Sequence, residues 1–214
     1  MTSHSDYKNA DVRPRALASD YIWVKENSLT RYFCNKVIKK FDEEPDIYDG
    51  LIGDDRRVDK TIKDTKDFAL TRNKRWGKED AIFYAALKEG LKDYLTHLHD
   101  IHPNNLPNIR NKTRDTGYKL QRYEPGGFYD WHNDWTMDNK NGSRVYVFMW
   151  YLNTIRKKDG GYTEFTDGTR LQPKCGSLVL FPSTWTYLHR GYPPKVRKYI
   201  CNGWIYSRPW HVLK

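Results

Sequence analysis

The segment FYDWHNDW holds a histidine and an aspartate two residues apart, His132 and Asp134. We expect a β-strand over residues 128–134, in which residues two apart lie on the same face of a sheet. A neutral imidazole and a carboxylate on one face are two ligands for a divalent metal ion. Because a lone His-x-Asp pair recurs by chance, the prediction of a metal site needs a third ligand.

The third ligand that we expect is His189, which follows the apolar run SLVLFP and a short connection. An antiparallel barrel brings the end of such a strand back beside an earlier strand. Two histidines and one carboxylate on one side of a metal leave its other positions open, as in the non-haem Fe(II) oxygenases. A zinc hydrolase uses similar ligands but usually needs a nearby general base. The HExxH motif of metalloproteases does not occur in this sequence.

A buried positive charge is expected nine residues after His189, where Lys198 opens the run KYICNGWIY. The two-residue period of a strand places Lys198, Asn202 and Trp204 on one face. A cation inside a barrel needs an anion, because an unpaired buried charge is costly. The distal carboxylate of a cosubstrate is one such anion, and a carboxylate of the protein is the alternative. Arg197 is the competing basic residue, and its parity directs it to the other face.

These residues need a scaffold, and the second half of the chain reads as short β-rich runs separated by turn residues. The run 145–152 is apolar without alternation, which is typical of a strand buried on both faces. Two helices precede it, one capped by Ser28 and running to about Phe41, and one from near Lys78 that ends before Pro103. The expected strands cover residues 118–124, 128–134, 144–153, 162–166, 177–181 and 198–206.

This order of elements predicts a mainly β fold with flanking helices (α+β). We expect a double-stranded β-helix, or jelly roll, with the N-terminal helices packed on its outside. The length of 214 residues fits one domain. Residues 1–20 are predicted to be a flexible N-terminal arm, and residues 21–214 a single domain whose jelly-roll core covers about 117–207. A short edge strand is expected at 21–24.

The composition argues against several classes of protein. Aromatic residues make up 15% of the chain, which excludes wholesale disorder. No apolar run is long enough to span a membrane, and the first twenty residues lack the apolar region of a signal peptide. The three cysteines form no CxxC pair, which argues against a disulfide framework and a thiolate zinc site. We therefore expect a cytoplasmic protein without a membrane partner.

The chain is strongly basic, with 37 Lys and Arg against 27 Asp and Glu and a formal net charge of +10. Such a charge is compatible with nucleic acid as a partner. Acidic residues are interleaved with the basic ones, however, and no zinc-finger or RNP-like motif accompanies them. A generally basic surface is therefore the favoured interpretation, and nucleic acid the less favoured partner.

Taken together, these segments resemble the 2-oxoglutarate and Fe(II)-dependent dioxygenases, and among them the prolyl 4-hydroxylases. RYEPGGFYDWHNDW resembles the family's tyrosine, Gly-rich turn and His-x-Asp strand. YLN at 151–153 is similar to the strand with a cosubstrate-binding tyrosine, and DGGYTEF at 159–165 to the family's hairpin. HRGYPPKVRKYICNGW resembles the distal histidine and the basic residue that follows it. The chain lacks the disulfides and peptide-binding domain of the secreted members and is more similar to compact microbial or viral enzymes.

The resemblance implies roles for individual residues. The implied iron ligands are His132, Asp134 and His189. The implied cosubstrate-binding residues are Lys198, for the C5 carboxylate of 2-oxoglutarate, with Tyr151, Tyr123 and Asn202. The residues implied on the substrate side are Tyr129, Trp204 and Arg190. Barrel packing is the alternative role for each of the three tyrosines, and no catalytic side chain is implied beyond the metal ligands.

The implied reaction is hydroxylation of an unactivated C–H bond, with C4 of proline in a peptide or protein as the favoured target. 2-Oxoglutarate is decarboxylated to succinate and CO2, Fe(II) and O2 are required, and ascorbate is a candidate reductant. The charged segment 46–74 is predicted to close over a peptide. Four alternatives stay open: a free amino acid, a small metabolite or alkylated nucleic acid as the substrate, or a metal-binding module without activity.

Overall fold

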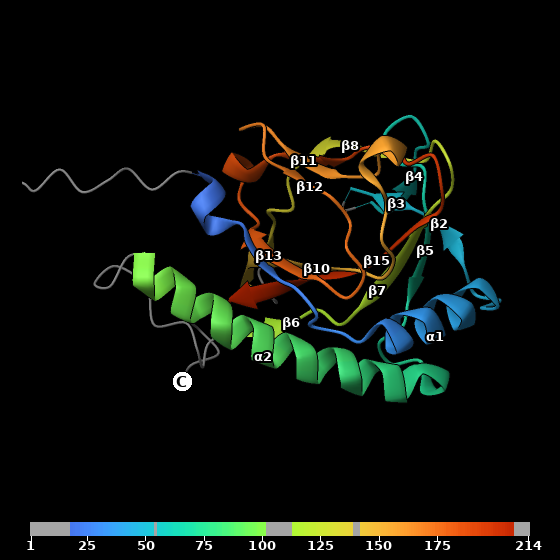
Figure 1. Ribbon diagram of the computed structural model, residues 1–214, viewed down its shortest axis with the longest axis horizontal. Coiled ribbons are helices and arrows are strands. Elements are labelled where there is room, and N and C mark those ends of the chain that lie inside the picture. The colour runs from blue at the N-terminus through green and yellow to red at the C-terminus, as the bar shows by residue number, and fades with distance from the viewer. Residues whose placement is uncertain (1–17, 54, 102–112, 139–141, 208–214) are drawn as a thin grey trace, which may run out of the picture.

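The computed structural model describes residues 18–53, 55–101, 113–138 and 142–207 (Figure 1). Most of the arm that we expect over residues 1–20 lies outside these residues, and its end forms the short 3-10 helix η1 (Ala18–Tyr21). No helix within the described ranges combines the length and the apolar character that crossing a lipid bilayer requires.

The larger of two facing sheets is antiparallel and lies between the smaller sheet and the two helices (Figure 1). Its strand order is β1-β13-β10-β15-β7-β5-β2, with β6 paired to β15 and β9 paired to β10. Its strands are β1 (Trp23–Lys25), β2 (Tyr48–Asp49), β5 (Lys66–Ala69), β6 (Thr113–Asp115), β7 (Lys119–Tyr123), β9 (Met137–Asp138), β10 (Gly142–Tyr151), β13 (Leu178–Pro182) and β15 (Lys198–Ser207).

The smaller sheet packs opposite the larger one and has the order β12-β11-β14-β8. Its strands are β8 (Tyr129–His132), β11 (Thr163–Phe165), β12 (Arg170–Leu171) and β14 (His189–Gly191). A separate hairpin pairs β3 (Leu51–Ile52) with β4 (Arg57–Val58). Two antiparallel sheets with helices outside confirm the predicted jelly roll.

Two helices cover the outer face of the larger sheet (Figure 1). They are α1 (Arg31–Asp42) and α2 (Gly77–Ile101). One face of α2 is apolar and buried: Phe83, Leu87, Tyr94 and Leu98 pack in the core that the helix shares with this sheet. Three single-turn 3-10 helices complete the fold: η2 (Lys74–Trp76), η3 (Lys157–Asp159) and η4 (Trp185–Tyr187).

The predicted cap of the first helix was wrong by two residues. The Oγ1 atom of Thr30 accepts a hydrogen bond from Phe33 N at 3.2 Å and caps α1. Ser28 instead accepts a hydrogen bond from the indole of Trp150 at 3.1 Å. Both residues carry a hydroxyl, so the choice between them depends on where the sheet places Trp150, which local sequence does not reveal.

Strand β10 contributes side chains to two hydrophobic cores. Phe148 and Trp150 belong to the core beneath the helices, whereas Val147, Met149 and Tyr151 belong to the core between the sheets. This double burial explains why the run is apolar at successive positions and confirms the prediction of a strand covered on both faces. The space between the sheets, lined from β10 and β15, is where the candidate site lies.

Candidate active site

The three expected metal ligands come together at the mouth of the space between the sheets. His132 ends β8 and pairs in register with His189, the first residue of β14. One donor atom from each of His132, Asp134 and His189 lies within 4.8 Å of the others. His189 Nε2 is 3.4 Å from Asp134 Oδ2. The distant histidine thus returns beside the His-x-Asp segment through the antiparallel pairing of β14 with β8.

Asp134 reaches the cluster by a different route from the one that the pattern predicts. We expected His132 and Asp134 on one strand, but β8 ends at His132 and Asp134 lies in the following loop. Arg144 on β10 donates a hydrogen bond from Nη1 to the backbone carbonyl of Asp134 at 3.2 Å. The position of the carboxylate therefore depends on a contact with the larger sheet rather than on strand parity.

Both histidines are oriented by backbone carbonyls. His132 Nδ1 lies 2.7 Å from the carbonyl oxygen of Asp130, and His189 Nδ1 lies 3.0 Å from that of Tyr187. A carbonyl oxygen only accepts, so each Nδ1 carries the hydrogen, and Nε2 is the nitrogen left to face the cluster. Hydrogen bonds of this kind fix the tautomer of metal-binding histidines.

The protonation states of the cluster suit a divalent cation. Burial and the neighbouring His189 lower the pKa of His132 to about 3, so its ring is neutral at pH 7. Burial raises the pKa of the Asp134 carboxyl, but the two histidines and Arg144 together outweigh it and the pKa is lowered. Two imidazole nitrogens and one carboxylate are a donor set typical of non-haem Fe(II).

Deeper in the same cavity, Lys198 at the start of β15 is only 1% exposed. Its Nζ lies 4.8 Å from the ring centroid of Tyr123 and 5.7 Å from that of Tyr151. Burial lowers its pKa to about 7, and among the described residues no carboxylate forms an ion pair with it. A buried lysine without a carboxylate partner among the described residues is suited to bind an anion from outside the chain.

The other residues of this wall follow the predicted alternation of β15. Lys198, Ile200, Asn202 and Trp204 all line a cavity of about 250 Å³ that also contains the three metal-ligand candidates. The side-chain oxygen of Asn202 is buried without a hydrogen-bond partner among the described residues. Arg197 points away, as its parity predicts, and donates to Glu124 at 2.8 Å.

Residues 118–206 match the family model described as the 2OG-Fe(II) oxygenase superfamily. The matched part runs from β7 into β15 and contains all three metal-ligand candidates and Lys198. The resemblance seen in the sequence is thereby confirmed, and with it a dioxygenase enzyme at the level of the family. No curated protein sequence matches the chain.

Several solved structures that are similar to this chain are prolyl hydroxylases from different sources. A viral collagen prolyl hydroxylase from Paramecium Bursaria Chlorella virus-1, in complex with 2OG, matches with a TM-score of 0.62 and 21% identity over 86% of this chain and 95% of that one. A Trichoplax adhaerens prolyl hydroxylase in complex with a hypoxia inducible factor peptide fragment matches at 0.70 and 15% over 88% and 84%. A Pseudomonas putida prolyl-4-hydroxylase matches at 0.59 and 18% over 89% and 97%. At these identities the matches support the fold.

The oxygenase has the groups that its family's cofactors require. Two imidazole nitrogens and a carboxylate oxygen converge without a fourth protein ligand among the described residues, which suits a metal that keeps open positions. The unpaired Lys198 suits a dicarboxylate bound alongside. Fe(II) and 2-oxoglutarate therefore both fit residues that the structure brings into one cavity.

Tyr129 lines this cavity, whereas Tyr151 is buried near Lys198 and is not among the lining residues. The hydroxyl of Tyr151 donates to Thr163 Oγ1 at 2.8 Å, beside Lys198. The ring of Tyr129 stacks on the ring of His132, with centroids 3.5 Å apart and planes 14° from parallel. Tyr129 therefore holds the orientation of a metal-ligand candidate while facing the cavity.

Arg190 does not join the others. It alternates with His189 and Gly191 on β14, so its side chain projects from the opposite face of the small sheet. There it pairs with Glu164 and lies over the ring of Trp131, 4.7 Å from the centroid. Its expected role on the substrate side stays a prediction that this placement does not favour.

The residues that sequence reasoning missed form a polar wall next to β15. Lys119 and Gln121 line the cavity from β7, and Lys63 lines it from the segment before β5. A signal existed for the first two, because Lys119, Gln121 and Tyr123 alternate on one face of a strand that was predicted. Lys63 lies outside any regular element and carries no periodic signal.

Proposed function

We propose that the protein hydroxylates C4 of proline in a peptide or protein. One C–H bond of the substrate, one 2-oxoglutarate and one O2 yield the hydroxylated product, succinate and CO2. The observation that carries this proposal is that an open His-Asp-His cluster and an unpaired buried lysine share one cavity. Metal binding alone would not require the buried Lys198. Its lowered pKa indicates that the charged form is unfavourable there in the absence of an anion.

We assign His132, Asp134 and His189 as the iron ligands. The two rings present Nε2 to the metal, because their Nδ1 hydrogens are held by backbone carbonyls. The carboxylate of Asp134 supplies the one negative charge of the ligand set. When bound, iron with 2-oxoglutarate and O2 supplies the oxidising power for the reaction, and the protein supplies positions and exclusion of water.

We assign Lys198 as the partner of the C5 carboxylate of 2-oxoglutarate. Ion pairing with a carboxylate offsets the desolvation of Lys198 and restores its proton. The hydroxyl of Tyr151, already ordered by Thr163, lies on the same side, and Tyr123 packs against Lys198. Asn202, with its buried and unpartnered oxygen, completes the cosubstrate wall.

A pair of exposed aromatic side chains beside the cavity supports a proline-containing peptide as the substrate. Trp135 and Trp185 are 38% and 62% exposed. Trp135 lines the cavity and meets Trp185 edge-on at 5.5 Å. Proline-rich segments characteristically dock against aromatic surfaces of this type. The solved relatives are prolyl hydroxylases, one of them in complex with a peptide, which favours the same substrate class.

The segment before the barrel is suited to cover that peptide. Asp64 N donates to Phe128 O and Asp130 N donates to Ile62 O, both at 2.8 Å, so this segment extends the edge of the small sheet next to β8. Residues 51–53 of the adjacent hairpin line the cavity. Replacing residues 51–58 with a short Gly-Ser turn is expected to reduce peptide hydroxylation more than succinate formation without peptide; equal peptide hydroxylation would remove this role.

The proposal is tested by mass spectrometry of proline-containing peptides incubated with the protein, Fe(II), 2-oxoglutarate and O2, with succinate measured in parallel. A gain of one oxygen at proline, matched by succinate and lost on omission of iron, is the expected result. Parallel reactions with and without ascorbate test the need for a reductant.

The remaining outcomes separate the alternatives. Succinate without a modified peptide would contradict proline hydroxylation, and the same assay would then be run on free amino acids, small metabolites and alkylated oligonucleotides. Bound iron with no succinate in any of these reactions would favour a metal-binding module without activity.

A further inference from the structure

A second group of positive charges lines the cavity at a distance from Lys198. Lys63 and Lys119 share one carboxylate, that of Asp67: Lys63 Nζ lies 2.7 Å from Asp67 Oδ2, and Lys119 Nζ lies 3.6 Å from the same atom. Thr65 and Gln121 also donate to Asp67, at 2.7 and 2.9 Å. Two ammonium groups thus face one carboxylate whose hydrogen-bonding capacity is largely filled.

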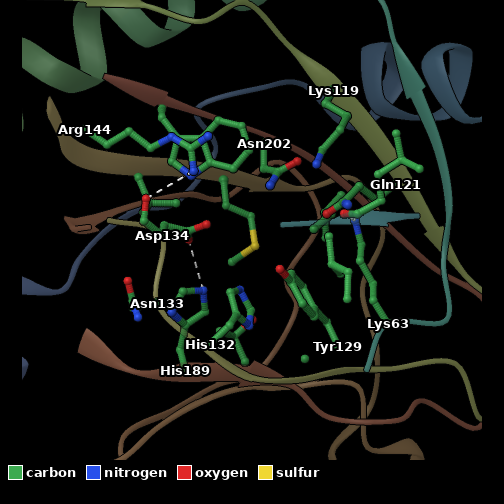
Figure 2. A pocket seen from close by; sticks show the side chains of 18 of the residues that line it. Lys63, Lys119, Gln121, Tyr129, His132, Asn133, Asp134, Arg144, His189 and Asn202 are labelled. Carbon is green, nitrogen blue, oxygen red and sulfur yellow. Dashed lines mark hydrogen bonds and ion pairs between the residues drawn. The ribbon is translucent and has the colours of Figure 1, made fainter. Parts of the chain in front are cut away.

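The pairing pattern separates this group from Lys198. Lys198 lies opposite Tyr123 on the neighbouring strand, whereas Lys119 lies opposite Asn202. The two pairs are four positions apart along β15, which corresponds to roughly 13 Å along the strand. Figure 2 shows Lys119 and Asn202 side by side, with their polar ends turned into the cavity.

The two positive ends differ in what they lack. Lys198 is fully buried and has no carboxylate partner among the described residues, so the distal carboxylate of 2-oxoglutarate is best accommodated there. At the other end Lys63 is 1% exposed and closely paired, and Lys119 keeps 22% of its side chain exposed. The charge that remains available to a second ligand therefore belongs to Lys119.

This end of the cavity is also close to the reacting centre. Lys63 Nζ lies 5.1 Å from the ring centroid of Tyr129, and that ring stacks directly on His132. Burial in the first place, and repulsion by the charge of Lys119 in the second, lower the pKa of Lys63 to about 8. A negatively charged ligand group next to Lys119 would relieve that repulsion.

We propose that Lys119, backed by Lys63 and Asp67, binds a carboxylate of the substrate, so that the preferred peptide carries Asp or Glu adjacent to the hydroxylated residue. This inference rests on the proposed function, because it specifies the substrate class of the same site. The proposed substrate carboxylate at Lys119 is distinct from the C5 carboxylate of 2-oxoglutarate, which is assigned to Lys198.

The test compares peptides that differ at one position beside the target proline, with Glu, Gln or Lys there, on each side in turn. A charge-assisted contact predicts that wild-type kcat/KM for the Glu peptide exceeds that for the Gln peptide by about tenfold or more, and the Lys peptide is poorest. Lys119→Met is expected to bring the Glu-to-Gln ratio close to one. Lys119→Arg keeps the charge and should preserve the preference. Lys92→Met, on the exposed face of α2, removes the same formal charge and serves as the matched control.

Binding is measured separately from turnover, so that failure of this inference and failure of the proposed function are distinguishable. Fluorescence anisotropy of labelled Glu and Gln peptides with the Fe(II) and 2-oxoglutarate-loaded protein, without O2, is expected to show the same preference and its loss in Lys119→Met. Equal binding of the two peptides to wild type would overturn the inference and leave proline hydroxylation standing. A peptide preference in anisotropy with no hydroxylated product would support the carboxylate site and contradict the proposed reaction.

Two further outcomes would also overturn the inference. A rise in the 2-oxoglutarate requirement of Lys119→Met to the level of a Lys198 variant would make Lys119 a cosubstrate anchor. Displacement of the Glu peptide by a short oligonucleotide at lower concentration than by unlabelled Glu peptide, in wild type but not in Lys119→Met, would assign the site to phosphate.

Discussion

At the scale of single residues, the candidate site depends on two charged side chains, those of Asp134 and Lys198. Asp134 is the one carboxylate of the proposed iron site, and it lies in a loop held by Arg144. Lys198 is the reverse case, a buried cation without a described carboxylate partner. Each of these groups is unfavourable alone in a low-dielectric interior and becomes favourable when its ligand arrives. This complementarity makes the two residues the most informative ones to change.

Replacing Asp134 with alanine is expected to abolish turnover, because it removes the only anionic ligand from the proposed iron site. Loss of outer-shell support alone costs about 10–100-fold in metal affinity, so loss of a direct ligand should exceed that. Succinate formation and the iron content after desalting report the effect. Asp100→Ala, at the exposed end of α2, is the control. Full activity of Asp134→Ala would contradict the iron assignment.

Replacing Lys198 with methionine should raise the 2-oxoglutarate concentration needed for half-maximal turnover by about 10–100-fold, the loss of one charge-assisted contact. Methionine keeps the apolar stem and so limits the effect on folding. Iron content should be retained, since Lys198 is not in the His-Asp-His cluster. Arg197→Met removes the neighbouring charge on the other face and is the matched control. If Arg197→Met had the larger effect, the anchor role would pass to Arg197.

At the scale of elements, the short strand β14 contributes to both the metal site, through His189, and the packing of Tyr123, through Gly191. Its alternation directs His189 and Gly191 inward and Arg190 outward, where Arg190 pairs with Glu164. Gly191 matters because it has no side chain. A Cβ at this position would lie 3.2 Å from the ring and 3.3 Å from the hydroxyl oxygen of Tyr123. Tyr123 in turn packs against Lys198, so β14 influences both the metal end and the cosubstrate end.

Gly191→Ala is therefore expected to displace Tyr123 and weaken 2-oxoglutarate binding. Overpacking a well-packed site typically costs about 1–3 kcal/mol, which corresponds here to a several-fold or greater rise in the 2-oxoglutarate requirement. The measurement is turnover as a function of 2-oxoglutarate concentration. Gly77→Ala is the matched control, because a Cβ there meets no atom within 4 Å. An unaltered requirement in Gly191→Ala would show that Tyr123 does not help to bind the cosubstrate.

At the scale of the whole molecule, stability and function are divided between two cores. The core beneath α1 and α2 is apolar, with Phe83, Trp150 and Leu178 among its fully buried members. The space between the sheets instead holds Lys63, Asp67 and Lys198, each about 1% exposed. Charged groups there lower the stability of the ligand-free fold, and the helix-covered core offsets that loss.

The ligand-free protein should become more stable as the pH rises from about 6.5 to 8.5. Lys198 has a folded pKa of about 7 and Lys63 one of about 8, both below the usual value of 10.5. Over this range the unfolded chain binds more protons than the folded one, so the free energy of unfolding rises with pH, by up to about 1.4 kcal/mol per pH unit for each lysine. Thermal unfolding at three pH values measures the slope.

The variant Lys198→Met provides the control for this pH dependence, because it removes one of the two titrating groups. Its slope should be smaller than that of the wild type, whereas Lys92→Met should keep the full slope. A wild-type Tm that falls between pH 6.5 and 8.5 would contradict the assignment of lowered lysine pKa values.

The sequence by itself determined the features that follow from local periodicity. The two-residue period placed Lys198, Asn202 and Trp204 on one face of β15 and Arg197 on the other. The apolar run 145–152 predicted a strand buried on both faces, and the helical periodicity after Lys78 predicted the helix that covers the sheet. These properties depend on neighbours within a few residues, which is the range over which a strand or helix repeats. The metal-ligand candidates were identifiable as well, since His132, Asp134 and His189 lie in short motifs of distinctive composition.

Only the tertiary structure decided which of these segments meet, and at which register. Asp134 lies beyond the end of β8 and is positioned by Arg144, a contact across sheets that strand parity does not describe. Lys63 belongs to a segment without a period, and its contact with Asp67, which Lys119 shares, arises where β5 pairs with β7. Arg190 on β14 pairs with Glu164 on β11, and no local pattern indicated that partner. Register between strands distant in sequence is set by the packing of both cores, and for that reason the charged wall around Lys119 is a property of the fold.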